Sequence, residues 1–188
     1  DAWEKGAYGA TSSHMDMASE IMSDGRRGHV QMVKGYYENT LLQNLASTMG
    51  MRPAKYVDVD VDLYSSSITS LAWLFDNNLI QVGTVIGYDD WWVVACASGG
   101  ESLHPLTIGE ARAHVEMAEK YHVRFRCLAG PCQLNSFPCE IGPIFVVEAI
   151  GGDTKPNHGF DMTERQVEVF RRLHPRCETF RRFTQRGM

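Results

Sequence analysis

The 188-residue sequence lacks any apolar run that approaches the length of a membrane-spanning helix, which needs about 20 consecutive apolar residues. It also lacks the charged segment followed by an apolar stretch that marks a secretory signal peptide. These absences predict a cytoplasmic protein without a membrane partner.

An excess of positive charge is also missing. The chain has 18 Lys and Arg against 23 Asp and Glu, for a net charge of -5, and no basic stripe runs through its main body. Proteins that bind nucleic acids carry a clustered basic surface that attracts the phosphates. The composition therefore predicts no nucleic-acid partner.

Cysteine is scarce, with five residues, and Cys127, Cys132 and Cys139 lie closest together. Their spacings form no Cys-x-x-Cys pair and no fourth ligand stands nearby, so free thiols are favoured over a zinc site. The chain also lacks a phosphate-binding glycine loop and any recognisable nucleophile signature. Its chemistry must come from other groups.

Carboxylates are present where two apolar runs end. The runs cover residues 57–64 and 84–91, and the segment 65–78 between them has the pattern of a helix that Ser65, Ser66 or Ser67 would cap. A strand-helix-strand unit with parallel strands places both carboxyl ends at one edge of the sheet, where α/β folds bind ligands. The carboxylates expected to converge there are Asp60, Asp62, Asp89 and Asp90.

The spacing of the first two carboxylates indicates a cation site. Asp60 and Asp62 lie two residues apart, so they share one face if the strand continues that far. Crowded carboxylates repel one another unless a cation or hydrogen-bond donors offset the charge, and Mg²⁺ or a similar hard ion prefers oxygen ligands. The alternative is that each Asp only caps a helix or begins a turn. Asp58, deeper in the same strand, is interpreted as a hydrogen-bonded structural residue.

Four motifs occur in a recognisable order. They are Val33-Lys34-Gly35-Tyr36-Tyr37-Glu38-Asn39-Thr40-Leu41, Asp60-Val61-Asp62-Leu63-Tyr64-Ser65-Ser66, Tyr88-Asp89-Asp90 and Gly109-Glu110-Ala111-Arg112-Ala113. Together they resemble the macrocin O-methyltransferase family of class I S-adenosylmethionine-dependent methyltransferases. The resemblance covers about residues 1 to 130.

The resemblance implies a fold and a reaction. The fold is a single α/β domain over residues 1–188, with a Rossmann-like sheet, helices on both faces and an antiparallel strand pair near its end. The reaction is methylation of a small-molecule hydroxyl, such as that of a sugar in a natural product, with S-adenosylmethionine and Mg²⁺ as cofactors. By resemblance, Asp60, Asp89 and Asp90 hold the metal, and Asp62 is the general base that deprotonates the acceptor.

The remaining pattern agrees with this fold except at its beginning. Helices are predicted over residues 14–23, 38–48, 110–121 and 163–186, the last broken near Pro175, and strands over 29–33, 123–128 and 144–150. No glycine-rich cofactor loop follows a strand before Lys34. The chain is therefore interpreted as truncated at its N-terminus, with its cofactor-binding residues unknown and residues 160–188 as a helical tail.

Further site residues are expected in the segment that follows Asp90. Trp91 and Trp92 are interpreted either as core residues or as rings that stack on the substrate, and His104 as a second proton carrier in a substrate loop. Glu110 falls in the first turn of a helix, where the helix dipole alone explains a carboxylate.

Two other functional classes stay open. The chain is alternatively a non-catalytic metal- or ligand-binding module, or a structural subunit whose open sheet edge another chain completes. The arginine-rich C-terminal segment is interpreted as a solvated face or as a homo-oligomer contact.

Overall fold

The computed structural model describes residues 31–92, 104–132 and 142–173, and the chain divides into two compact units after Thr40. In the first unit, the short helix α2 (Tyr37–Thr40) is held by a hydrogen bond from the Thr40 hydroxyl to the carbonyl of Tyr36. Residues 31–33 form no strand, so this part of the strand predicted over 29–33 is wrong. Met32 and Val33 are exposed, so their side chains do not pack in a core that would stabilise an extended strand.

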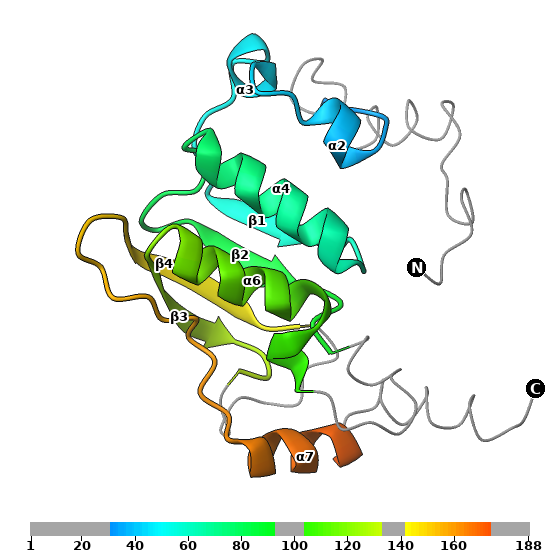
Figure 1. Cartoon of the computed structure of the whole chain (residues 1–188), viewed down its shortest axis with the longest axis vertical. Coiled ribbons are helices and arrows are strands. Elements are labelled where there is room, and N and C mark those ends of the chain that lie inside the picture. The colour runs from blue at the N-terminus through cyan, green and yellow to red at the C-terminus, as the bar shows by residue number, and fades with distance from the viewer. Residues whose placement is uncertain (1–30, 93–103, 133–141, 174–188) are drawn as a thin grey trace, which may run out of the picture. The chain divides into compact units, whose positions relative to one another are not determined.

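The second unit is built on a mixed four-stranded sheet (Figure 1). Its strands are β1 (Tyr56–Val59), β2 (Val85–Tyr88), β3 (Val123–Ala129) and β4 (Ile144–Ile150), in the order β1-β2-β4-β3. The first two strands are parallel, and β4 is antiparallel to both of its neighbours. The predictions of an α/β fold and of an antiparallel strand pair near its end are confirmed.

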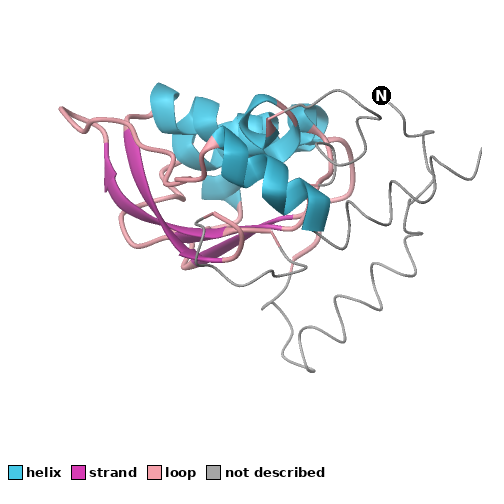
Figure 2. Cartoon of the chain, turned by 90° about the horizontal axis from the view of Figure 1, so that it is seen from below, coloured by secondary structure: helices cyan, strands magenta, loops and turns pink. Residues whose placement is uncertain are grey.

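Two helices cover one face of this sheet, as Figures 1 and 2 show. They are α4 (Tyr64–Asp76), which joins the parallel strands β1 and β2, and α6 (Gly109–Lys120). Both helices were expected from their apolar periodicity and are confirmed. In Figure 2 the described helices of this unit lie on one side of the sheet, so the expectation of helices on both faces is wrong within the described residues.

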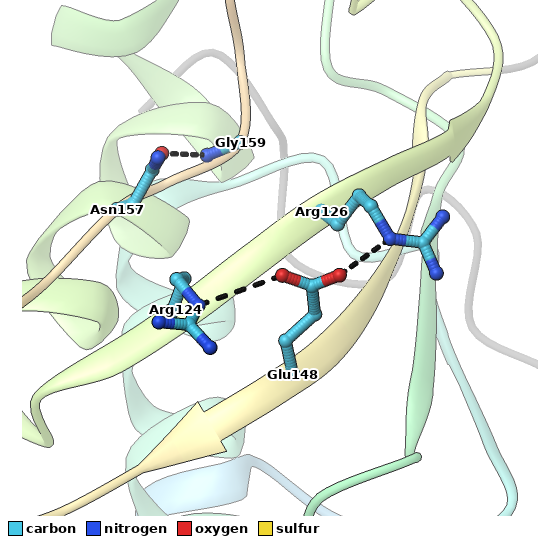
Figure 3. Close-up of polar contacts among 5 residues, drawn as sticks. All are labelled: Arg124, Arg126, Glu148, Asn157 and Gly159. Carbon is cyan, nitrogen blue, oxygen red and sulfur yellow. Dashed lines mark hydrogen bonds and ion pairs between the residues drawn. The ribbon is translucent and has the colours of Figure 1, made fainter. Parts of the chain in front are cut away.

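No described helix covers the opposite face, which carries charged residues. Glu148 of β4 pairs with Arg124 at 3.5 Å and with Arg126 at 2.5 Å, and both arginines are more than half exposed (Figure 3). Along β3, these arginines alternate with the buried Val123 and Phe125. This alternation is typical of a sheet with one face on the core and one in water.

The start of α4 differs from the prediction. Its N-cap is Leu63, and no side chain caps the helix, whereas a cap from Ser65, Ser66 or Ser67 was expected. The helix already begins at Tyr64, so the serines fall inside its first turns. There the Ser67 hydroxyl donates a hydrogen bond back to the carbonyl of Leu63 at 2.8 Å.

The single helix predicted over 38–48 is wrong. The structure has α2 and a second short helix, α3 (Leu45–Thr48), separated by non-helical residues 41–44. In the second unit, a small apolar cluster of Ala46, Trp73 and Leu79 holds α3, and the indole nitrogen of Trp73 donates to the carbonyl of Leu42 at 2.9 Å. This tertiary bond stabilises the irregular segment.

The C-terminal helix is confirmed as far as it is described. Helix α7 (Glu164–Leu173) begins one residue after the predicted start, and the break near Pro175 and the rest of the tail lie outside the described residues, as does the helix predicted over 14–23. No described helix combines the length and the apolar character needed to cross a membrane.

The prediction of free thiols is wrong for two cysteines. Cys127, two residues before the end of β3, is paired in a disulfide with Cys132, and their Cα atoms lie 6.2 Å apart. This separation is within the range that a disulfide bridges. The β3 strand ends at Ala129 and the chain then turns back at Gly130, which brings the two cysteines together. Cys139 lies outside the described residues.

Candidate metal centre

An acidic cluster lies where the two parallel strands end. Asp60 follows β1 and Asp89 and Asp90 follow β2, and each offers a carboxylate oxygen within 4.8 Å of the others. The convergence expected from the sequence is therefore confirmed for these three carboxylates. We refer to Asp60, Asp89 and Asp90 as the acidic cluster.

The register of the sheet creates this proximity. Val59 at the end of β1 pairs with Tyr88 at the end of β2, and both side chains are buried. The backbone N–H of Asp89 then donates to the carbonyl of Val59 at 3.0 Å, which continues the parallel pairing by one step. Asp60 and Asp89 consequently leave the sheet side by side.

Asp62, the predicted general base, is not a member of the acidic cluster. The expectation that it shares a strand face with Asp60 is wrong, because β1 ends at Val59. Asp62 instead lies in the loop before α4, half-buried, with a φ of 57° in the left-handed region that Asp tolerates better than most residues. Asp58 accepts a hydrogen bond from the Tyr56 hydroxyl at 3.0 Å, as its predicted structural role requires.

The donor set of the cluster fits a hard divalent cation. Ligands at about 2.1 Å from Mg²⁺ lie at most about 4.2 Å apart across the ion, and Ca²⁺ allows slightly longer separations. The three oxygens lie within 4.8 Å of one another, so small side-chain movements would bring them to ligand spacing. Asp60 is exposed, Asp89 is half-buried and Asp90 is 8% exposed, so the cluster is open to solvent at Asp60 and anchored in the protein at Asp90.

Glu110 lies directly behind the acidic cluster. It is completely buried in the first turn of α6, and its two carboxylate oxygens accept backbone hydrogen bonds from Val61 at 3.2 Å and from Asp90 at 3.1 Å. The helix-dipole interpretation of Glu110 missed these bonds. The available signal was its helical spacing, which places it on the same face as the buried Ala113, His114 and Met117.

The environment of Glu110 strongly perturbs its ionisation. The pKa of Glu110 is raised to about 8, chiefly by burial and also by the negative charges of Asp90 and Asp60, although the hydrogen bonds from the Val61 and Asp90 N–H groups oppose this rise. Glu110 is thus coupled electrostatically to Asp90 and Asp60, and positive charge added beside these three groups would be favourable.

The two tryptophans that follow the cluster are core residues in this structure. Trp91 and Trp92 are 1% and 2% exposed. The Trp91 ring lies 5.0 Å from that of Tyr88 and 5.3 Å from that of Phe145, centroid to centroid. Of the two interpretations left open by the sequence, the structure therefore supports the core role, because neither ring presents a face for a substrate.

His104 also lies apart from the acidic cluster. Its Nδ1 accepts a hydrogen bond from the Leu106 N–H at 3.3 Å and so caps the short 3₁₀ helix η1 (Pro105–Thr107). Partial burial lowers the pKa of His104, and the nearby Glu164 opposes this effect. Its role as a proton carrier stays a prediction.

A second histidine, which the sequence reading missed, is buried next to β2. The Nε2 of His114 lies 2.9 Å from the carbonyl of His158, which can only accept, so this nitrogen carries the proton. Its Nδ1 then accepts from the Tyr88 hydroxyl at 2.8 Å. Tyr88 immediately precedes Asp89. Its hydrogen bond with His114 therefore fixes the end of β2, which is followed by two members of the acidic cluster, Asp89 and Asp90.

A groove of about 610 Å³ lies along α4 and α6 and is lined by residues such as Ile68, Ala72 and Val115. It includes no member of the acidic cluster. The chemistry suggested by the carboxylates therefore belongs to the sheet edge and not to this groove.

Comparison with protein-family models, with curated proteins and with solved structures gave no match to this chain. The relationship to the macrocin O-methyltransferase family therefore stays a prediction from the motifs.

Proposed function

We propose that this chain is a divalent-metal-dependent, S-adenosylmethionine-dependent O-methyltransferase that acts on a hydroxyl of a small molecule, such as a sugar. The observation that supports it most is the acidic cluster at the carboxyl edge of a parallel strand pair. The order of the four motifs that resemble the macrocin O-methyltransferase family supports it independently.

Each carboxylate has a distinct part in this proposal. Asp60, Asp89 and Asp90 would hold the cation, which supplies Lewis-acid polarisation of acceptor hydroxyls when it is bound. Asp62, in the loop that follows Asp60, would accept the proton of the hydroxyl that is methylated. S-adenosylmethionine would donate the methyl group, and no residue is assigned to its binding.

A non-catalytic metal-binding module is the second candidate. It needs only the acidic cluster, which offers three carboxylates to a cation, and it needs no site for the methyl donor. This candidate requires cation binding and no affinity for the methyl donor or for its product.

Calorimetric titration of S-adenosylhomocysteine into the chain, with and without Mg²⁺, separates the two candidates. Micromolar binding is the result expected of a methyltransferase. Binding of Mg²⁺ without S-adenosylhomocysteine would contradict the methyltransferase proposal and favour the binding module, whereas binding of neither would contradict both.

Two substitutions should separate metal binding from proton transfer. Asp89→Ala removes a ligand and should weaken Mg²⁺ binding at least about tenfold, because second-shell losses alone cost this much. Asp62→Asn should leave Mg²⁺ affinity nearly unchanged and lower turnover at least about 100-fold, the usual contribution of a general base. Calorimetry measures the first effect, and methyl transfer to a panel of glycosides measures the second.

Asp58→Asn is the matched control for lost charge. Asp58 lies two residues before Asp60 on the same segment but outside the cluster, so its substitution should preserve both metal affinity and turnover. Wild-type affinity in Asp89→Ala, or wild-type turnover in Asp62→Asn, would contradict the assigned roles.

A further inference from the structure

Glu110 joins the two loops that carry the acidic cluster, although it belongs to neither of them. We infer that Glu110 is a positioning residue, which sets the separation of Asp60 from Asp90 by binding both loops through one carboxylate. The inference rests on the metal site of the proposed function and assigns that site a fourth acidic residue.

The two hydrogen bonds of Glu110 come from different segments. Oε1 accepts from the N–H of Val61, the residue after Asp60, and Oε2 accepts from the N–H of Asp90 itself. Each bond therefore lies within one residue of a member of the acidic cluster. A shift of the Glu110 carboxylate would move both loops relative to each other.

The geometry requires the two oxygens of a carboxyl group and not merely a polar side chain. Both bonding partners are N–H donors, so both atoms at the end of the side chain must be acceptors. A glutamine in this position would direct its amide NH₂ at one of the donors and leave that N–H unsatisfied. An unsatisfied buried donor is unfavourable, and the loop that carries it is expected to move.

Fold stability alone does not explain this residue. A carboxyl group that is fully buried close to Asp60 and Asp90 carries a desolvation cost and adds repulsion whenever it is ionised. The helix dipole at the first turn of α6 and the two hydrogen bonds from Val61 and Asp90 act against this cost. A requirement for two aligned acceptors behind a cation site accounts for a carboxyl group at this position.

The test compares Mn²⁺ affinity, measured by electron paramagnetic resonance, with the thermal unfolding midpoint of the metal-free protein. Glu110→Gln should lower Mn²⁺ affinity by about 10- to 100-fold, as does the loss of other residues that orient metal ligands. Glu110→Asp keeps the carboxyl group but is one methylene shorter, so it cannot reach both donors and should also lose affinity. Wild-type Mn²⁺ affinity in either variant would overturn the inference, whatever the change in unfolding temperature.

Glu116→Gln is the matched control on the same helix. Glu116 accepts a hydrogen bond from Tyr64 and pairs with Arg112, and it makes no bond to either loop of the acidic cluster. Its substitution should leave Mn²⁺ affinity unchanged, and an equal loss in Glu116→Gln and Glu110→Gln would overturn the inference.

The outcomes distinguish this inference from the proposed function. If the wild-type chain does not bind Mn²⁺, the proposed metal site fails and the inference fails with it. If the wild type binds and Glu110→Gln binds equally well, only the inference fails.

If the Glu110 variants do not fold, amide hydrogen exchange of the wild-type chain tests the two hydrogen bonds that Glu110 accepts. The Val61 and Asp90 amides should exchange at least about tenfold more slowly than their intrinsic rates, as hydrogen-bonded amides do. Exchange of either amide at its intrinsic rate would overturn the inference.

Discussion

Replacement of Trp91 by alanine should lower the free energy of unfolding by about 3–5 kcal/mol, the usual cost of removing a large buried aromatic side chain. Trp91 is 1% exposed and packs against Tyr88, Phe145 and Phe160. The substitution would leave a large cavity beside the strand that ends in Asp89. Urea denaturation of the metal-free protein measures the effect.

The matched control is Val82→Ala, because Val82 is 61% exposed and should change the free energy of unfolding by less than about 0.5 kcal/mol. This comparison also decides between the two interpretations of Trp91 drawn from the sequence. If Trp91→Ala kept wild-type stability and lost only acceptor binding, the ring would be a substrate contact and its assignment to the core would be wrong.

Acidification should destabilise the fold through His114. Burial lowers the pKa of His114 to about 3, from an ordinary value of 6.5. Between these two values the unfolded chain binds a proton at this residue and the folded chain does not, so stability rises with pH. The stabilisation is fully present above about pH 6.5 and is lost as the pH falls from there towards 3, by about 1.4 kcal/mol per pH unit.

Urea denaturation at pH 7, 6 and 5 measures this dependence, with His114→Gln as the non-titrating comparison. The variant should be less stable than the wild type at pH 7, because Tyr88 and His158 lose their shared partner. The difference between the two proteins should then shrink as the pH falls. A constant difference from pH 7 to pH 5 would contradict the assignment of a neutral, buried imidazole.

Local patterns predicted the elements that position the site. The β-branched run before Asp60 and the apolar periodicities of residues 65–78 and 110–121 predicted β1, α4 and α6, since these residues bury one face whatever the rest of the chain does. The run that ends at Asp89 predicted β2 for the same reason. Parallel pairing across a helix then made the meeting of their carboxylates predictable.

Predictions from local sequence patterns were wrong where long-range contacts compete with the local conformational preference. The apolar spacing of Leu41, Leu42 and Leu45 indicated one helix over 38–48, yet the Trp73 indole binds the Leu42 carbonyl and the segment 41–44 is not helical. Cys127 and Cys132 gave no reliable spacing signal, and the turn at Gly130 brings them together. Such contacts depend on where the folded chain places its segments.

The amino-acid sequence was enough to predict that carboxylates gather at the ends of two parallel strands, because a strand-helix-strand pattern directs both carboxyl ends to one edge of the sheet. The strand pattern predicted four converging carboxylates and the family resemblance assigned three of them to a metal, but their spatial proximity depends on the tertiary structure. It excludes Asp62 from the cluster because β1 ends at Val59, and it adds Glu110 behind the cluster, from a helix 49 residues beyond Val61. Burial and hydrogen bonding between such distant residues arise from packing, which no local periodicity encodes.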